Sequence, residues 1–182
     1  MTLKTDEKLA EIRLLLLDVD GVLTEGDIFY TDDKVEIKRF NVKDGLGLRL
    51  LMDGGVGVGI VTGRRSKSLA HRCENLGITL IFDGVKDKAA LLGDIQKKTG
   101  VAPPQMAFVG DDLPDMPIMN RVGLSIAVSD AHEIVRDKAD MVTLAKGGCG
   151  AVREVCEAIL KAKGLWEQIV ENFTSCLKEK NE

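Results

Sequence analysis

The sequence predicts an α/β fold in which a doubly wound parallel sheet carries helices on both faces. Residues 14–17 are four consecutive leucines, and an apolar run without polar alternation is typical of a strand buried on both faces, as at the centre of a parallel sheet. Stretches with strand character alternate along the chain with stretches of helical periodicity, which indicates consecutive β-α units. At 182 residues the chain can bury a substantial core, and we expect residues 1–182 to form a single domain.

The expected strands are short apolar runs bounded by polar residues or glycine, and the expected helices carry apolar side chains on one face, as Leu91, Leu92 and Ile95 do. Strands are predicted at residues 13–18, 56–61, 79–82, 106–109, 124–128 and 141–144. Helices are predicted at residues 5–12, 45–52, 66–76, 87–99, 131–138, 151–162 and 165–178. A short helix after residue 109 should be interrupted by Pro114 and Pro117, because proline lacks the backbone donor that a helix interior needs.

Residues 27–40 interrupt the β-α alternation and predict a β-hairpin that projects from the main sheet. The turn is expected at Asp32-Asp33-Lys34, and the strand after it alternates apolar with charged side chains. This alternation places Val35, Ile37 and Arg39 on one face, and Glu36, Lys38 and Phe40 on the other. The apolar side chains would form an exposed patch on a monomer, unless the hairpin packs against other copies or folds back on its own domain.

Composition argues against several classes of protein. A formal net charge of -4 and the lack of a long basic stretch argue against nucleic-acid binding. No apolar run approaches the ~20 residues of a membrane span, and residues 1–7 lack the apolar segment of a signal peptide, so we expect a cytoplasmic protein. The four cysteines form no CxxC pair and only two histidines accompany them, which argues against a zinc site or a disulfide framework.

Polar side chains suited to metal and phosphate chemistry follow three of the predicted strands. The segments are Asp18-Val19-Asp20-Gly21 after the leucine run, Thr62-Gly63-Arg64-Arg65 after residues 56–61, and Gly110-Asp111-Asp112 after residues 106–109. An acidic turn would explain any one of them, since Asp and Gly are ordinary turn residues. Because the carboxyl ends of parallel strands share one edge of the sheet, where open α/β folds bind ligands, all three are expected to meet there. Hard oxygen ligands suit Mg²⁺, which would neutralise the clustered acids.

These side chains can be given roles in phosphoryl transfer. Asp18 is the candidate nucleophile, because carboxylates attack phosphorus and form aspartyl-phosphate intermediates. Asp20, two residues on, could act as general acid toward the leaving group and then as general base on water. Asp111 would complete the Mg²⁺ site, and Thr62 offers a hydroxyl donor to a phosphoryl oxygen. Lys88, at the start of a helix, is placed to be the fixed cation that the developing phosphoryl charge requires.

The chain carries four segments that resemble the motifs of the haloacid dehalogenase superfamily of phosphatases, both in their order and in their placement at strand ends. They are Asp18-Val19-Asp20-Gly21, Thr62-Gly63, Lys88 and Gly110-Asp111-Asp112. The finer resemblance is to 3-deoxy-D-manno-octulosonate 8-phosphate phosphatases. It is carried by Phe40-Asn41-Val42-Lys43-Asp44-Gly45, Thr62-Gly63-Arg64, Gly110-Asp111-Asp112-Leu113-Pro114-Asp115 and Gly147-Gly148-Cys149-Gly150-Ala151-Val152-Arg153-Glu154. Acylneuraminate 9-phosphate phosphatases share most of these segments, so an eight-carbon and a nine-carbon sugar-acid phosphate both remain open as substrates.

The resemblance implies roles for the remaining site residues. Mg²⁺ would be bound by the carboxylates of Asp18 and Asp111 and by the backbone carbonyl of Asp20. Asp112 would support either the metal shell or Lys88. The substrate would be bound by Thr62, Gly63, Arg64 and Lys88, with the guanidinium of Arg64 facing the sugar-acid carboxylate. Asp115 has a weaker claim as a supporting residue, since acids near helix N-termini are common for dipole reasons alone.

The spacing of the motifs leaves no room for a cap domain over the site. The first gap, residues 21–61, holds only the hairpin and one helix, and the second, residues 63–87, holds one helix and one strand. An uncapped site is open, and the resemblance implies that a homotetramer supplies the lid, with the hairpins gathered at its centre.

Two other classes of protein share parts of this pattern. A signalling receiver domain also uses clustered aspartates, a threonine and a lysine with Mg²⁺. Its paired acids lie on the first strand, however, whereas Asp111 and Asp112 follow Lys88 here. A binding module that had kept the fold and lost the chemistry would lack a motif residue, and none is missing. The sequence therefore predicts a Mg²⁺-dependent sugar-acid phosphatase.

Overall fold

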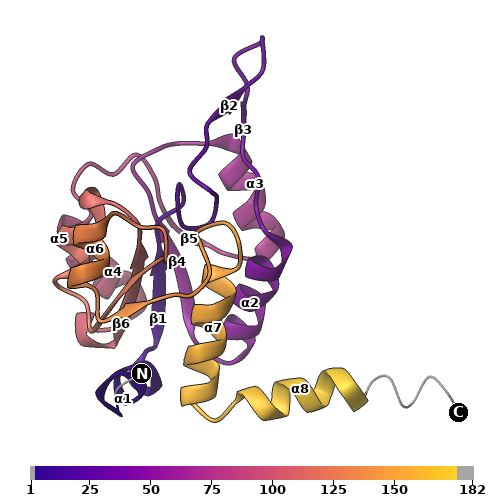
Figure 1. Cartoon of the computed structure of the whole chain (residues 1–182), viewed down its shortest axis with the longest axis vertical. Helices are drawn as coiled ribbons and strands as arrows, with labels where there is room; N and C mark the ends of the chain where they lie inside the picture. Colours follow the sequence, from indigo (N-terminus) through magenta and orange to yellow (C-terminus); the bar gives the residue numbers. More distant parts are fainter. Residues whose placement is uncertain (1–2, 176–182) are drawn as a thin grey trace, which may run out of the picture.

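The computed structural model describes residues 3–175 and contains the predicted doubly wound parallel sheet (Figure 1). The strands of this range that form the sheet are β1 (Leu14–Leu17), β4 (Gly57–Val61), β5 (Leu80–Phe82), β6 (Met106–Gly110), β7 (Leu124–Ala127) and β8 (Met141–Val142). Their order is β5-β4-β1-β6-β7-β8, and every pairing is parallel. The chain winds outward from β1 in one direction and then in the other, so the strand order reverses between β1 and β6. Open α/β sheets bind their ligands outside such a reversal, beyond the carboxyl ends of the strands.

Helices cover both faces of this sheet, as predicted. Those of the described range are α1 (Leu3–Glu11), α2 (Val42–Asp53), α3 (Lys67–Leu76), α4 (Leu92–Thr99), α5 (Met116–Met119), α6 (Glu133–Lys138), α7 (Ala151–Ala162) and α8 (Trp166–Ser175). Shorter 3-10 turns are η1 (Ala89–Leu91), η2 (Pro103–Gln105) and η3 (Leu113–Asp115). Figure 1 shows α2, α3 and α7 on one side of the sheet, and α4, α5 and α6 on the other. No helix of residues 3–175 is long and apolar enough to cross a membrane.

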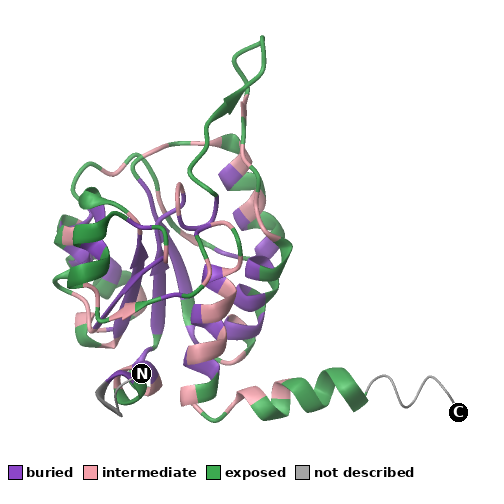
Figure 2. Ribbon diagram, in the orientation of Figure 1, coloured by how far each residue is buried: buried purple, intermediate pink, exposed green. Residues whose placement is uncertain are grey.

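The core follows from the sequence of the central strand. All four leucines of β1 are buried, and β1 pairs with β4 and β6 along its whole length. Figure 2 shows buried residues concentrated in the sheet and on the helix faces against it. The helices α2 and α7 approach closely because Gly47 has no side chain, and a Cβ there would lie 3.1 Å from Cα of Arg153.

Each element predicted within the described range is present, with shifted ends where local capping decides the boundary. The helix predicted at residues 45–52 begins at Val42, because the Asn41 side chain accepts from the backbone N–H of Lys43 at 2.8 Å and caps it. The segment predicted as one helix at 87–99 is divided into η1 and α4. The turn η2 was not predicted. The last helix is described to Ser175, so its predicted residues 176–178 lie outside the described range.

The predicted hairpin projects from the body of the molecule above the carboxyl edge of the sheet (Figure 1). It consists of β2 (Phe29–Tyr30) and β3 (Glu36–Ile37), which pair antiparallel, with Phe29 opposite Ile37. Its strands are shorter than the alternation of residues 35–40 suggested. The ladder of these two strands forms a sheet of its own, separate from the main sheet, and an isolated hairpin gains little from extending.

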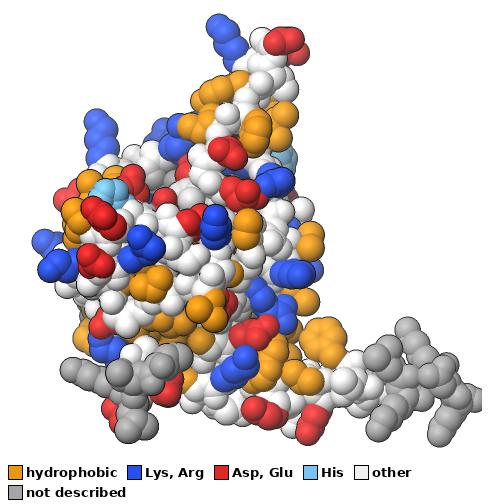
Figure 3. All heavy atoms as spheres, viewed as in Figure 1, with side chains coloured by type: hydrophobic (Ala, Val, Ile, Leu, Met, Phe, Trp, Pro, Cys, Tyr) orange, Lys and Arg blue, Asp and Glu red, His pale blue; other side chains and the backbone are white. Residues whose placement is uncertain are grey.

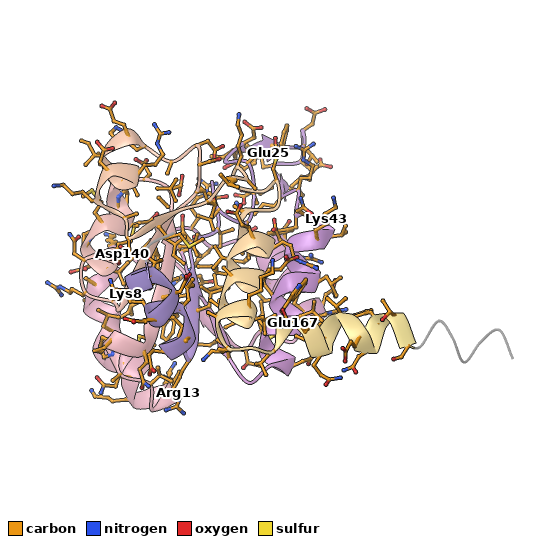
Figure 4. All side chains as sticks on the ribbon, turned by 60° about the horizontal axis from the view of Figure 1, so that its bottom comes forward. Lys8, Arg13, Glu25, Lys43, Asp140 and Glu167 are labelled. Carbon is orange, nitrogen blue, oxygen red and sulfur yellow. The ribbon has the colours of Figure 1, made fainter. Side chains whose placement is uncertain are left out.

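The N-terminal helix α1 packs at the opposite edge of the sheet. Figure 4 shows Lys8 of α1 beside Asp140, and the Lys8 Nζ lies 2.6 Å from the Asp140 Oδ1. Asp140 also accepts from the backbone N–H of Ser125 at 2.9 Å, so the ion pair ties α1 to the strands β7 and β8. Beyond α7, the helix α8 extends away from the body (Figures 1 and 4). Its first residue, Trp166, receives cation–π contacts from Arg153 and Lys161.

Candidate active site

The carboxyl ends of β1, β4 and β6 meet at a cavity of about 320 Å³. Its lining consists of Asp18, Asp20, Thr62, Gly63, Arg64, Val85, Lys86, Lys88, Asp111, Asp112, Pro114 and Asp115. Every residue that the sequence nominated for the site is therefore in one place. Val85, Lys86 and Pro114 were not nominated, and they belong to the loops that carry Lys88 and the acids after β6.

Lys88 is buried between two carboxylates. Its Nζ lies 2.7 Å from the Asp18 Oδ1 and 2.5 Å from the Asp115 Oδ1, and all three side chains are at most 12% exposed. The Asp18 backbone N–H donates to the Val109 carbonyl at 3.0 Å, which fixes the start of the loop on the neighbouring strand β6. Burial alone would lower the pKa of Lys88, but the Asp18 and Asp115 charges raise it, so the ammonium stays protonated. The cluster holds a fixed positive charge beside the candidate nucleophile.

Asp111 completes an acidic cluster opposite Lys88. One oxygen from each of Asp18, Asp111 and Asp115 lies within 4.8 Å of the others. Gly21 makes room for this approach, because it has a φ of 89° and a Cβ there would overlap the carboxylate of Asp111. Burial and the neighbouring carboxylates raise the pKa of Asp18 to about 6 and that of Asp111 to about 8, since one lysine does not balance the acids.

The donor set fits a hard divalent cation such as Mg²⁺. The oxygens of Asp18 and Asp111 face the same space, and burial together with the neighbouring acids raises their pKa values, so a bound cation would favour their ionised forms. Asp115 is engaged differently. Its Oδ1 accepts from Lys88, and its Oδ2 accepts from the backbone N–H of Asp111 at 3.0 Å. Asp115 therefore holds Lys88 and the loop in place, and the carboxylates suited to the metal are those of Asp18 and Asp111.

We expect the affinity for Mg²⁺ to rise with pH between about 6 and 8. A carboxylate must lose its proton to bind the metal, and in the metal-free site those protons leave at a pH of about 6 for Asp18 and about 8 for Asp111. Because both pKa values lie above the ordinary value of 3.8, the metal-free protein should also lose stability as the pH rises from about 4 to about 8. Isothermal titration calorimetry at pH 6, 7 and 8 measures the affinity. An affinity independent of pH would contradict this assignment of ligands.

The structure shows that Asp115, and not Asp112, contacts Lys88. Asp112 is exposed, and its Oδ1 accepts from the backbone N–H of Leu113 at 2.8 Å, which caps η3. The second carboxylate on Lys88 belongs to Asp115, whereas the sequence interpretation left Asp112 to support either the metal shell or Lys88 and gave Asp115 the weaker claim. Asp115 does sit in the first turn of η3, as expected, but its burial sets it apart from a solvent-exposed capping residue. Support of the metal shell by Asp112 stays a prediction.

Thr62 and Gly63 form the wall of the cavity contributed by β4. Thr62 is buried, its backbone N–H donates to the Phe82 carbonyl at 2.9 Å, and its own carbonyl accepts from Val85 at 3.0 Å. Its Oγ1 accepts from the backbone N–H of Arg64 at 3.3 Å. These bonds hold the hydroxyl at the carboxyl end of β4, where it can donate to an anion in the cavity.

The hairpin contributes two charged residues to the site that the sequence interpretation missed. Lys38 forms an ion pair with the carboxylate of Asp20, and its Nζ lies 3.0 Å from the Glu36 Oε1. Arg64, which was expected to face a substrate, donates from Nη2 to the Glu36 Oε2 at 2.7 Å. The alternation of residues 35–40 had placed Glu36 and Lys38 on one face of the strand. Two opposite charges on one face were the available sign of a role in the site, but the sequence did not show that this face would lie against the site.

The glycine-rich segment before α7 packs against the loop that carries Asp20. The backbone N–H of Gly148 donates to the Val22 carbonyl at 2.9 Å, and that of Gly147 donates to the Asp130 Oδ1 at 2.9 Å. A Cβ on Gly147 would overlap the carbonyl of Gly21. Residues 147 and 148 are therefore glycines because the backbone of the loop after β1 passes directly against them.

Comparisons with known proteins agree with this arrangement. A family model described as haloacid dehalogenase-like hydrolase matches residues 80–155. The chain is 48% identical over 157 residues to the 3-deoxy-D-manno-octulosonate 8-phosphate phosphatase KdsC of Escherichia coli, covering 86% of this chain and 84% of that one. It is similar to the crystal structure of the phosphatase of the same name from Yersinia pestis, with a TM-score of 0.90, 45% identity, and coverage of 92% and 90%. It is also similar to that from Moraxella catarrhalis in complex with magnesium ion, phosphate ion and KDO, with a TM-score of 0.92, 39% identity, and coverage of 95% and 99%.

Proposed function

The chain belongs to the 3-deoxy-D-manno-octulosonate 8-phosphate phosphatases among the haloacid dehalogenase-like hydrolases, and we propose that it hydrolyses that sugar-acid phosphate through an aspartyl-phosphate on Asp18. That it is a phosphatase follows from the family. The finer proposal is supported by one observation above all, the placement of Lys88 between Asp18 and Asp115 at the edge of an acidic cluster. The Moraxella relative, whose structure contains magnesium, phosphate and KDO, supports the same metal and product.

In the first step an oxygen of Asp18 attacks the phosphorus and the bond from phosphorus to the sugar oxygen breaks. Asp20, which must be protonated at this point, gives its proton to that departing oxygen, which leaves as the sugar hydroxyl. Lys88 and the hydroxyl of Thr62 stabilise the negative charge on the phosphoryl oxygens. Asp115 keeps Lys88 in position through the contact at 2.5 Å.

In the second step Asp20, now ionised, takes a proton from water as the water oxygen attacks the phosphorus. The bond from phosphorus to Asp18 breaks, inorganic phosphate leaves, and both carboxyl groups return to their starting states. Mg²⁺, held by the carboxylates of Asp18 and Asp111 and the carbonyl of Asp20, would supply positive charge to offset that of the phosphoryl group and the acids.

Arg64 is the candidate for the substrate carboxylate, because it lines the same cavity and its guanidinium has donors in addition to the Nη2 that contacts Glu36. We propose the eight-carbon substrate on the names of the relatives, and the nine-carbon acylneuraminate 9-phosphate stays the alternative. Phosphate release from the two compounds, each with Mg²⁺ and with excess chelator, tests the proposal. Faster turnover of the eight-carbon compound that disappears with chelator is expected, and faster turnover of the nine-carbon compound would contradict the substrate assignment.

The site is uncapped, as the sequence predicted. Residues 21–61 and 63–87, all of them described, contain the hairpin, α2, β4, α3 and β5 and no cap domain. Exposed apolar side chains gather on the hairpin (Figure 3), namely Ile28, Phe29, Tyr30, Val35 and Ile37. We propose that the hairpins pack together in a homotetramer, which would cover this patch and bring a neighbouring subunit to the rim of the site.

We expect Phe29→Asp together with Ile37→Asp to give smaller species and to impair turnover of the sugar-acid phosphate. These side chains are paired across the hairpin and each is at least half exposed, so two charges there would oppose packing between copies. Activity on p-nitrophenyl phosphate should fall less, because that small substrate needs no lid. Light scattering at micromolar concentration gives the assembly size. Ile134→Asp, at a similarly exposed isoleucine on α6, is the control, and a monomeric unmodified protein would contradict the proposal.

A further inference from the structure

A closed ring of charged side chains joins the base of the hairpin to Asp20. Lys38 pairs with the Asp20 Oδ1 and with the Glu36 Oε1. The other oxygen of Glu36 accepts from the Arg64 Nη2 at 2.7 Å, and the Arg64 Nε lies 3.5 Å from the Asp20 Oδ2. The ring therefore holds each oxygen of Asp20 beside a different cation. Lys38 directly follows β3, and Arg64 lies in the loop after β4.

Lys38 is the most enclosed member of the ring. Its side chain is 2% exposed, against 20% for Asp20, 16% for Glu36 and 40% for Arg64. An enclosed ammonium costs free energy unless carboxylates surround it, and Lys38 lies between the carboxylates of Asp20 and Glu36. Burial opposes the charge of Glu36, but hydrogen bonds from Arg64 and Lys38 lower its pKa, so Glu36 is ionised and holds both cations.

Asp20 needs such restraint for the chemistry proposed above. Its carboxyl must meet the departing sugar oxygen in one step and the attacking water in the next, and proton transfer falls steeply when the donor is misplaced. Asp20 lies on a loop, three residues beyond the end of β1, so the backbone alone leaves its side-chain torsions free. We infer that Lys38 is a positioning residue that fixes the carboxyl of Asp20 for proton transfer, with Glu36 holding Lys38 in place.

This inference rests on the proposed acid–base role of Asp20. It differs from a role in which Lys38 only fastens the hairpin to the body. A fastening residue would affect all substrates alike, whereas a residue that acts through Asp20 matters most when the leaving group needs a proton. Phenolate needs that proton far more than p-nitrophenolate does, so the two aryl phosphates separate the roles without depending on the natural substrate.

The test compares kcat/KM for phenyl phosphate and p-nitrophenyl phosphate in Lys38→Met and Asp20→Asn, singly and combined. We expect Lys38→Met to lower the value for phenyl phosphate by about 100-fold and that for p-nitrophenyl phosphate by less than about fivefold. In the Asp20→Asn background the same change should cost less than about threefold, because its effect passes through Asp20. Lys38→Arg should restore part of the loss. Lys43→Met, at an exposed lysine on α2, should change neither value.

Equal losses on both aryl phosphates, or a full loss from Lys38→Met in the Asp20→Asn background, would overturn the inference and assign Lys38 to holding the hairpin. If Lys38→Met does not fold, Lys38→Gln keeps a donor without the charge and is read in the same way. The proposed mechanism fails separately. If Asp20→Asn itself shows no dependence on the leaving group, Asp20 is not the general acid, whatever the Lys38 variants do.

Discussion

The substitution Asp18→Asn should lower phosphatase turnover by at least about 1,000-fold, equivalent to roughly 4 kcal/mol of transition-state stabilisation. The amide cannot attack phosphorus as a carboxylate does, and it also replaces one of the proposed Mg²⁺ ligands and the partner of Lys88 at 2.7 Å. Release of p-nitrophenolate and of inorganic phosphate under saturating substrate and Mg²⁺ measures the loss. Residual activity within tenfold of the unmodified enzyme would mean that Asp18 is not the nucleophile.

Without metal, Asp18→Asn should be at least as stable at high pH as the unmodified protein. The pKa of Asp18 is raised to about 6, so the cost of ionising this carboxyl in the folded protein lowers stability as the pH rises from about 4 to about 6. Asparagine removes that charge, and thermal unfolding of the variant should depend less on pH than that of the unmodified protein. Asp137→Asn, at an exposed position, is the control for both measurements. A variant that unfolds at ordinary temperature would leave the activity loss uninformative about chemistry, and Asp18→Ser would then replace it.

Most of the site could be predicted because parallel strands turn local sequence into long-range proximity. Asp18, Thr62 and Asp111 are far apart in the chain, yet each follows an apolar run, and parallel pairing brings the ends of those runs together. The same reasoning located Lys88 only through its position after the strand β5. Its burial between two carboxylates depends on how the loops fold over the edge, which a periodic pattern does not describe.

The sequence interpretation missed the contacts of residues whose local pattern is already explained by ordinary secondary structure. Asp115 sits in a helical first turn, where an acid is ordinary, and only the structure shows it on Lys88. Glu36 and Lys38 alternate with apolar residues as any half-exposed strand does. Their contacts depend on the direction in which the hairpin leaves the body, and the partners, Asp20 and Arg64, are distant from them in sequence.

Lys88→Met is expected to have the second large effect, abolishing turnover and destabilising the metal-free protein. Methionine fills a similar volume but leaves Asp18 and Asp115 facing each other without the ammonium that now lies within 2.7 Å of both. Removing one partner of a buried ion pair typically costs about 3–5 kcal/mol, because the remaining charge has no compensation. Transition-state stabilisation falls as well, since no fixed cation remains beside the phosphoryl oxygens.

The pH dependence of this variant separates electrostatics from packing. Without Lys88 the carboxyls of Asp18 and Asp115 can lower their repulsion by taking up a proton, so the loss of stability should be larger at pH 8 than at pH 5. Thermal unfolding at both pH values measures it, and Lys97→Met, at an exposed lysine of α4, should show neither effect. A loss of stability equal at the two pH values would indicate a packing defect. Turnover within tenfold of the unmodified enzyme would remove Lys88 from the proposed mechanism, because no other lysine or arginine among residues 3–175 is in ion-pair contact with Asp18.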